Sequence, residues 1–141
     1  MDPVTFMKTV YVGDRACKRI ILDGWNNQII VQVNRISRVR DPSGQWNFYD
    51  AEDINDGLIV LSQVEFFIMD PPGLVPNDEI YDIVVEPLDG EGCTSEKPLY
   101  LFKFYIGHVD QEANHQEVTI SIKAQSVHLE DPSQPGIPIT D

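Results

Sequence analysis

Apolar and polar residues alternate in short stretches along the whole chain, with turn signals between them. One example is the stretch 99–109, in which alternate positions are apolar: Tyr100, Phe102, Phe104 and Ile106. This period of two is typical of half-buried strands, and the stretches are rich in β-branched and aromatic residues. The pattern predicts seven strands: Val4–Val12, Cys17–Leu22, Gln28–Val39, Leu58–Met69, Ile80–Glu86, Leu99–Val109 and Glu117–Leu129.

The alternation changes phase inside two of these stretches. In Gln28–Val39 the apolar positions leave their register near Asn34–Arg35, and in Glu117–Leu129 they move from even positions to Val127 and Leu129. One extra residue in a strand moves the following side chains to the opposite face. We therefore predict a β-bulge in each stretch.

Only one segment between the strands favours a helix. Asp50 can cap a short helix that runs through Asn55, with Gly57 at its end. Elsewhere the connections are turns or loops, of which Leu88–Pro98 is the longest polar one, and residues 131–141 contain three prolines and predict an extended tail. The pattern contains neither a long helical period nor strand–helix–strand spacing.

These features together define a fold class. Short strands separated by turn signals are typical of all-β proteins. The sequence predicts a mostly β, antiparallel sandwich or open barrel of about seven strands with at most one short helix. It also predicts a single domain over residues 1–130, followed by an extended proline-rich tail over residues 131–141.

The charge is strongly acidic and unevenly distributed. The 141 residues have a formal net charge of -13. Residues 41–96 contain fourteen acidic residues and no Lys or Arg, whereas residues 1–40 contain seven basic and three acidic residues. Such a field disfavours nucleic acid and anionic membranes and attracts a basic protein. High net charge also serves solubility alone, and that alternative stays open.

The beginning of the chain indicates a compartment. The first ten residues, MDPVTFMKTV, lack the basic-then-apolar pattern of an export signal. The longest apolar run, Leu58–Met69, is too short for a membrane helix. We therefore expect a cytoplasmic protein. Cys17 and Cys93 are then expected to be free thiols, although the sequence leaves a disulfide between them open.

Catalytic motifs are absent from the sequence. The chain contains no G-x-S-x-G nucleophile elbow and no glycine-rich phosphate loop. Cys17 lies near Arg15 and Lys18, but a small residue in a strand is more typical of a core position. We predict no catalytic residues and no cofactor.

One cluster has the residue types of a metal site. A hairpin after the strand 99–109 can bring together His108, Asp110, Glu112 and His115. Imidazole and carboxylate groups bind divalent metals, but these positions do not have the spacing of a known zinc motif. Ordinary loop and edge positions are the alternative interpretation.

Acidic and aromatic residues near two turns predict a partner-binding surface. Exposed aromatic side chains on loops often anchor protein contacts. Alternatively, the aromatic residues fold back over the end of the sandwich and the acidic residues form a solvated face. The predicted partner-binding residues are Asp50, Glu52, Asp53, Asp56, Trp46, Phe48, Tyr49 and Trp25.

Several short segments together carry a resemblance to a known group of proteins. They are Gly13–Cys17, Asp23–Asn26, Trp46–Tyr49, Val64–Phe67, Pro76–Glu86 and Leu129–Pro132. The chain resembles a bacterial family of small acidic proteins of unknown function. In the order of its strands it is similar to β-rich immunity-type proteins, which neutralise toxins by binding them. The resemblance implies no catalytic residue.

The sequence therefore favours a non-catalytic module that recognises another protein, with a basic toxin domain as one such partner. Two alternatives remain. The chain can be the structural subunit of a homo-oligomer that pairs through an exposed strand edge. It can also be a metal-dependent enzyme that uses the residues from His108 to His115.

Overall fold

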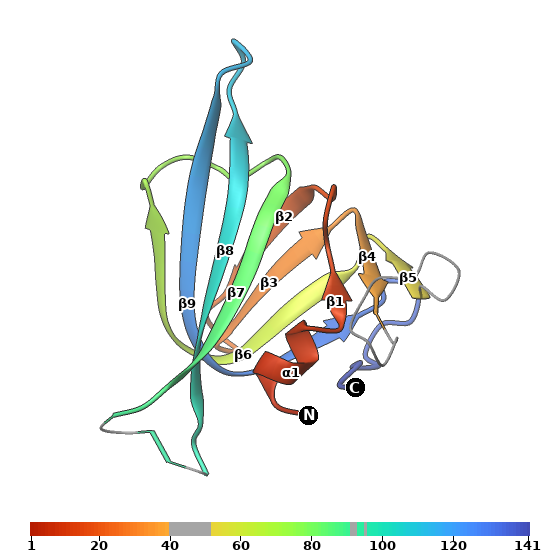
Figure 1. Cartoon of the computed structure of the whole chain (residues 1–141), viewed down its shortest axis with the longest axis vertical. Helices are drawn as coiled ribbons and strands as arrows, with labels where there is room; N and C mark the ends of the chain where they lie inside the picture. Colours follow the sequence, from red (N-terminus) through yellow and green to blue (C-terminus); the bar gives the residue numbers. More distant parts are fainter. Residues whose placement is uncertain (40–51, 91–92, 95) are drawn as a thin grey trace.

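The computed structural model describes residues 1–39, 52–90, 93–94 and 96–141. Its main feature is a six-stranded antiparallel sheet in the order β2-β3-β6-β9-β8-β7 (Figure 1). The strands are β2 (Cys17–Asp23), β3 (Gln28–Val33), β6 (Leu58–Asp70), β7 (Ile80–Leu88), β8 (Leu99–Val109) and β9 (His115–Glu130). The predicted mostly β, antiparallel class is confirmed, with nine strands in the described residues instead of about seven.

The large sheet curls so that its two outer strands meet at one point. Ala16 and Glu79 form an isolated antiparallel bridge, in which the backbone N–H of Cys17 donates to the carbonyl of Asp78 at 2.9 Å. The N–H of Ile80 donates to the carbonyl of Arg15 at 2.8 Å. Beyond this bridge β2 and β7 do not pair, so the curled sheet does not form a closed barrel.

A second sheet packs beside the first. It contains β1 (Val10–Tyr11), β4 (Arg35–Arg38) and β5 (Glu52–Asn55) in the order β1-β4-β5. The predicted strand Gln28–Val39 is therefore not one bulged strand. Its apolar positions change phase because the chain leaves the large sheet at Asn34 and enters the small one, where Ile36 is fully buried.

The second predicted bulge also lies elsewhere. β9 is a continuous strand, and the register shift falls on its partner β6 between Val64 and Phe66. Gln63 precedes the shift with a φ of 52°. The extra residue is thus accommodated on β6, which strengthens the bend of this long strand.

The beginning of the predicted strand Val4–Val12 is instead the helix α1 (Pro3–Met7). Asp2 caps it by accepting a hydrogen bond from the backbone N–H of Thr5 at 3.0 Å, and Pro3 occupies the first turn. An acidic cap followed by proline is a helix-start signal. It prevails over the β-propensity of Val4 and Thr5, because the helix also buries Phe6 and Met7.

The predicted helix from Asp50 to Asn55 is also wrong where the structure describes it. Glu52–Asn55 forms strand β5 and pairs with β4, and Ile54 enters the core. Gly57 follows, and a Cβ there would lie 2.7 Å from the Ile36 side chain. Cross-strand pairing and burial therefore override the local capping signal. Asp50 lies outside the described residues.

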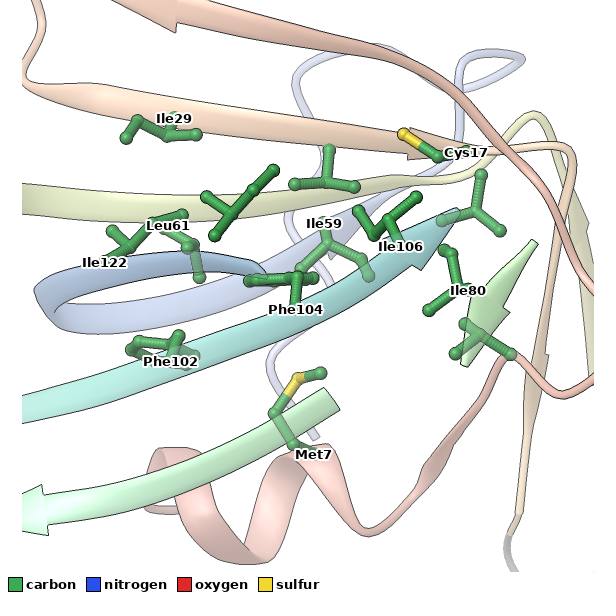
Figure 2. Close-up of a cluster of buried hydrophobic side chains, with 14 of the residues drawn as sticks. Met7, Cys17, Ile29, Ile59, Leu61, Ile80, Phe102, Phe104, Ile106 and Ile122 are labelled. Carbon is green, nitrogen blue, oxygen red and sulfur yellow. The ribbon is translucent and has the colours of Figure 1, made fainter. Parts of the chain in front are cut away.

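The core lies inside the curl of the large sheet. Figure 2 shows Phe102, Phe104 and Ile106 of β8 beside Ile122 of β9, with Met7 of α1 reaching toward them from below. These β8 positions are the apolar face that alternation predicted, and all three are fully buried. The core therefore fixes which face of each strand points inward.

The C-terminal tail is attached to the end of β9 by backbone hydrogen bonds. In the tail 131–141, Ile139 exchanges two backbone hydrogen bonds with Leu129, at 2.8 and 3.0 Å. Leu88–Pro98 connects β7 to β8 and is only partly described. None of the described helices is long and apolar enough to cross a membrane.

Candidate functional site

The outer edge of β2 is one of the two outer backbone edges of the large sheet. It is bonded at its start, where Cys17 meets Asp78. From Lys18 to Asp23 it has no partner strand among the residues that the structure describes, because β3 pairs with its other side. Such an edge presents backbone donors and acceptors to any incoming strand.

The two faces of β2 differ in character. Ile20 and Leu22 lie opposite the buried residues Val31 and Ile29 of β3, so they point to the inner side of the sheet. Arg19, Ile21 and Asp23 alternate with them and point outward. An apolar inner face therefore lies directly behind the open edge.

A groove follows this edge on the inner side. It runs between β2, the second half of β6 and the segment 73–77, and has a volume of about 420 Å³. Its apolar lining comes from Ile20, Leu22, Phe67, Met69 and Leu74. A smaller hollow of about 280 Å³ shares Leu22 and Phe67 and extends toward the β2–β3 turn. The volume of the larger groove lies in the range of small-molecule pockets.

The second half of β6 forms the opposite side of the groove. β3 pairs with β6 only from Leu58 to Leu61, whereas β9 pairs with it as far as Asp70. Within the described chain, residues 65–70 of β6 are therefore paired on one side alone. Two unpaired sheet edges thus border one apolar groove.

Large apolar side chains around the groove face solvent. Trp25, in the β2–β3 turn, is 95% exposed, Val75 is 68% exposed and Leu22 is 60% exposed. The alternative in which Trp25 folds back over the sandwich is therefore wrong. Clustered exposed apolar groups on a protein surface often mark a binding site.

Charged groups flank this apolar centre on the outward face. The Nε of Arg19 donates a hydrogen bond to the Oε1 of Gln32 on β3. Asp23 accepts hydrogen bonds from the side chain of Asn26 at 2.9 Å and from its backbone N–H at 3.1 Å. These bonds hold the pKa of Asp23 below its usual value. Arg19 and Asp23, two residues before and two residues after Ile21, are therefore a cation and an anion held in fixed positions.

The predicted acidic surface is only partly described and is partly engaged internally. Asp53 accepts a hydrogen bond from the Ser37 hydroxyl at 2.5 Å, and Asp56 forms an ion pair with Lys18 at 2.7 Å. Glu52 and Asp53 belong to the small sheet, whereas Trp25 belongs to a turn of the large one. Asp50, Trp46, Phe48 and Tyr49 lie outside the described residues.

The structure does not assemble the four residues of the metal hypothesis into one group. His108 bonds through Nδ1 to the carbonyl of Val75 at 2.6 Å, and His115 lies 3.8 Å from Asp78. Asp110 accepts bonds from the N–H groups of Glu112 and Asn114. No three His, Cys, Asp or Glu side chains in the described part of the chain are placed to hold a metal ion.

The thiols are separate and differ in exposure. Cys17 is buried at the start of β2, and burial raises the pKa of its thiol to about 11. Cys93 is half-buried in the loop before β8. A thiol with so high a pKa is almost entirely protonated at neutral pH and is a poor nucleophile.

Sequence reasoning missed the β2 edge, although a signal for it exists. Three apolar residues, Ile20, Ile21 and Leu22, follow one another before a hairpin turn. A strand with one solvated face alternates, whereas this one is apolar on both faces at its end. Consecutive apolar residues in a strand that proves to be an edge indicate a covered or partner-binding edge.

The comparisons with known proteins identify a family. The model of one family, described as a "Family of unknown function (DUF6258)", matches residues 1–141, and the chain belongs to this family. No curated protein and no solved structure matches the chain.

Proposed function

We propose that this member of the DUF6258 family is a non-catalytic protein-binding module that takes up an extended segment of a partner protein along β2. The observation that supports this proposal is the unpaired edge of β2 directly beside an apolar groove. Strand addition to such an edge gives affinity through backbone hydrogen bonds and specificity through pockets for alternate side chains.

The partner segment has a definite chemistry on this proposal. Its inward side chains are apolar, because they enter the groove beside Leu22, Phe67 and Met69. Burial of apolar surface contributes about 25 cal/mol per Å², so the exposed Leu22 and Trp25 supply part of the driving force. The backbone of the segment pairs with residues 18–23.

A matched pair of substitutions tests the site. Leu22→Glu places a charge in the groove, whereas Ile68→Glu places it on an exposed position of β6 outside the groove lining, where the native side chain is 49% exposed. We expect tagged wild-type protein and the Ile68 variant to retain the same partner in pull-downs, and the Leu22 variant to lose it. Equal retention by all three proteins would show that the site lies elsewhere.

A second candidate, an immunity-type protein that binds a basic toxin domain, rests on the charge distribution. Residues 41–96 contain fourteen acidic residues without a single Lys or Arg. A basic partner would then associate faster at low salt. Charge reversal at Asp50, Glu52, Asp53 and Asp56 should slow that association and reduce its salt dependence. Association that is changed neither by the salt concentration nor by these reversals would exclude this candidate.

A further inference from the structure

We propose that the strand taken up by β2 is β2 of a second copy of this chain, paired antiparallel about a two-fold axis through Ile21. The proposal rests on the proposed binding edge and names its occupant. Two-fold symmetry requires a surface that complements itself, because each contact occurs twice. The sequence of β2, CKRIILD, meets this requirement in one register.

The chemistry of the outward face selects that register. With the axis at Ile21, Arg19 lies opposite Asp23 of the second copy, and the two Ile21 side chains face each other. Opposite charges across an antiparallel pair stabilise it, and here the pair forms twice. Both side chains point to the outward face of the sheet, and both are already held by bonds within their own hairpin, to Gln32 and to Asn26.

The neighbouring registers do not provide this complementarity. Opposite residues of an antiparallel pair share a face, so the two-fold axis must pass through a residue. An axis at Ile20 places Arg19 opposite Ile21, and an axis at Leu22 places Asp23 opposite Ile21. Each leaves the charges facing apolar side chains, so the axis at Ile21 is the favoured one.

The inner face gains apolar contacts in the same register. Ile20 of one copy lies opposite Leu22 of the other, which covers Leu22, an apolar residue that is 60% exposed in one chain. The pairing also brings the β2–β3 turn of the second copy to the level of Cys17, next to the segment 73–77 that borders the groove. Trp25 of that turn and Val75 of that segment are both largely exposed in one chain, so both are available for apolar contacts there.

Long-range charge opposes the pairing and sets its salt dependence. Two chains that each have a net charge of -13 repel one another, whereas β2 itself has two basic residues and one acidic residue. Screening reduces long-range repulsion more than it reduces a close ion pair. A strand-pair interface is also small. We therefore expect a reversible dimer that depends on concentration and strengthens from very low to moderate salt.

Two single charge variants test the register. Arg19→Asp sets Asp opposite Asp twice, and Asp23→Arg sets Arg opposite Arg twice. Each variant alone should dimerise at least about tenfold more weakly than the wild type in sedimentation experiments. Mixed together, they place Asp opposite Arg at both positions, and we expect the mixture to recover dimers to within about threefold of the wild type.

Controls separate loss of pairing from loss of folding. Lys97→Asp makes the same change in net charge as Arg19→Asp, but at an exposed position outside β2, and should leave dimerisation unchanged. Circular dichroism of each variant reports folding, and the recovery in the mixture cannot come from unfolded chains.

The possible failures are distinguishable. A wild-type chain that stays monomeric at all concentrations overturns the second-copy proposal, while a partner lost only by the Leu22→Glu variant still supports the binding edge. A dimer that neither single variant weakens, or whose loss the mixture does not restore, overturns this register. If the Leu22→Glu variant keeps both the partner and the dimer, the proposed function is overturned as well.

Discussion

The two outer strands of the large sheet differ in how their edges are protected. β7 has Asp82 and Glu86 at exposed positions, Pro87 near its end and a register shift between Ile80 and Asp82. Helix α1 also packs against it. Charges, proline, bulges and covering elements are the usual means by which proteins block edge-to-edge pairing.

Among the described residues, the middle of β2 has none of these features. Ile20, Ile21 and Leu22 occupy the centre of the edge, and its register shift lies at the start, between Cys17 and Arg19, where the edge is already bonded to Asp78. The same sheet thus blocks one edge and leaves the other open beside a groove. Because the chain has the means to protect an edge, this difference supports the proposal that the open edge of β2 takes up a strand.

The largest expected effect concerns the point where the two edges meet. Ile80→Ala removes a side chain that is fully buried beside the β2–β7 bridge, and we expect it to lower the free energy of unfolding by about 2 to 5 kcal/mol. Leu22→Ala on the open edge should cost less than about 1 kcal/mol, because that side chain is mostly exposed. Urea unfolding of both variants measures the contrast, and equal losses would contradict the assignment of Leu22 to an open edge.

The next effect is a pH dependence at the protected start of β2. Burial raises the pKa of Cys17 from 9.0 to about 11, so the folded state disfavours the thiolate. The resulting stabilisation is complete below pH 9 and is lost as the pH rises through the folded-state pKa. Two pKa units correspond to at most about 2.7 kcal/mol. Cys17→Ala should lack this decline in unfolding experiments, and an identical decline in the variant would assign it to other groups.

The smallest effect on stability comes from exchanging the character of the two edges. Ile21→Lys should protect the edge of β2 against pairing with another chain. The double change Glu86→Val with Pro87→Val should make the edge of β7 open to such pairing. We expect each to alter the free energy of unfolding by less than about 1 kcal/mol, but to alter self-association in opposite directions. Light scattering during slow heating measures this, and association that rises in both variants would show that β2 is not the open edge.

The sequence predicts well those parts of the fold in which alternation and turn signals agree. Leu99–Val109 is a strand with these bounds, and Leu58–Met69 and Ile80–Glu86 differ from the observed strands by one or two residues at one end. In these strands one face enters the core, so the apolar period is set by burial. Glu52–Asn55 contradicts its local signals because pairing with β4 and burial of Ile54 decide its conformation.

The candidate site depended on information that local patterns do not contain. Ile20–Leu22 is visible as an apolar run, but its position at an edge follows from strand order, in which β6 pairs with the distant β9. The groove likewise requires β6 to continue beyond the end of β3. The sequence contains these residues, whereas their juxtaposition arises from pairings between remote segments.

The long pairing of β6 with β9 has a consequence for synthesis of the chain. β9 begins at His115, 45 residues after β6 ends at Asp70. At about 5 to 20 residues per second, a ribosome needs roughly 2 to 9 s to make that interval. During this time only Leu58–Leu61 of the long strand β6 has a partner strand from the completed part of the chain. The nascent protein therefore depends on its last strand, and the apolar strand must be shielded until that strand emerges.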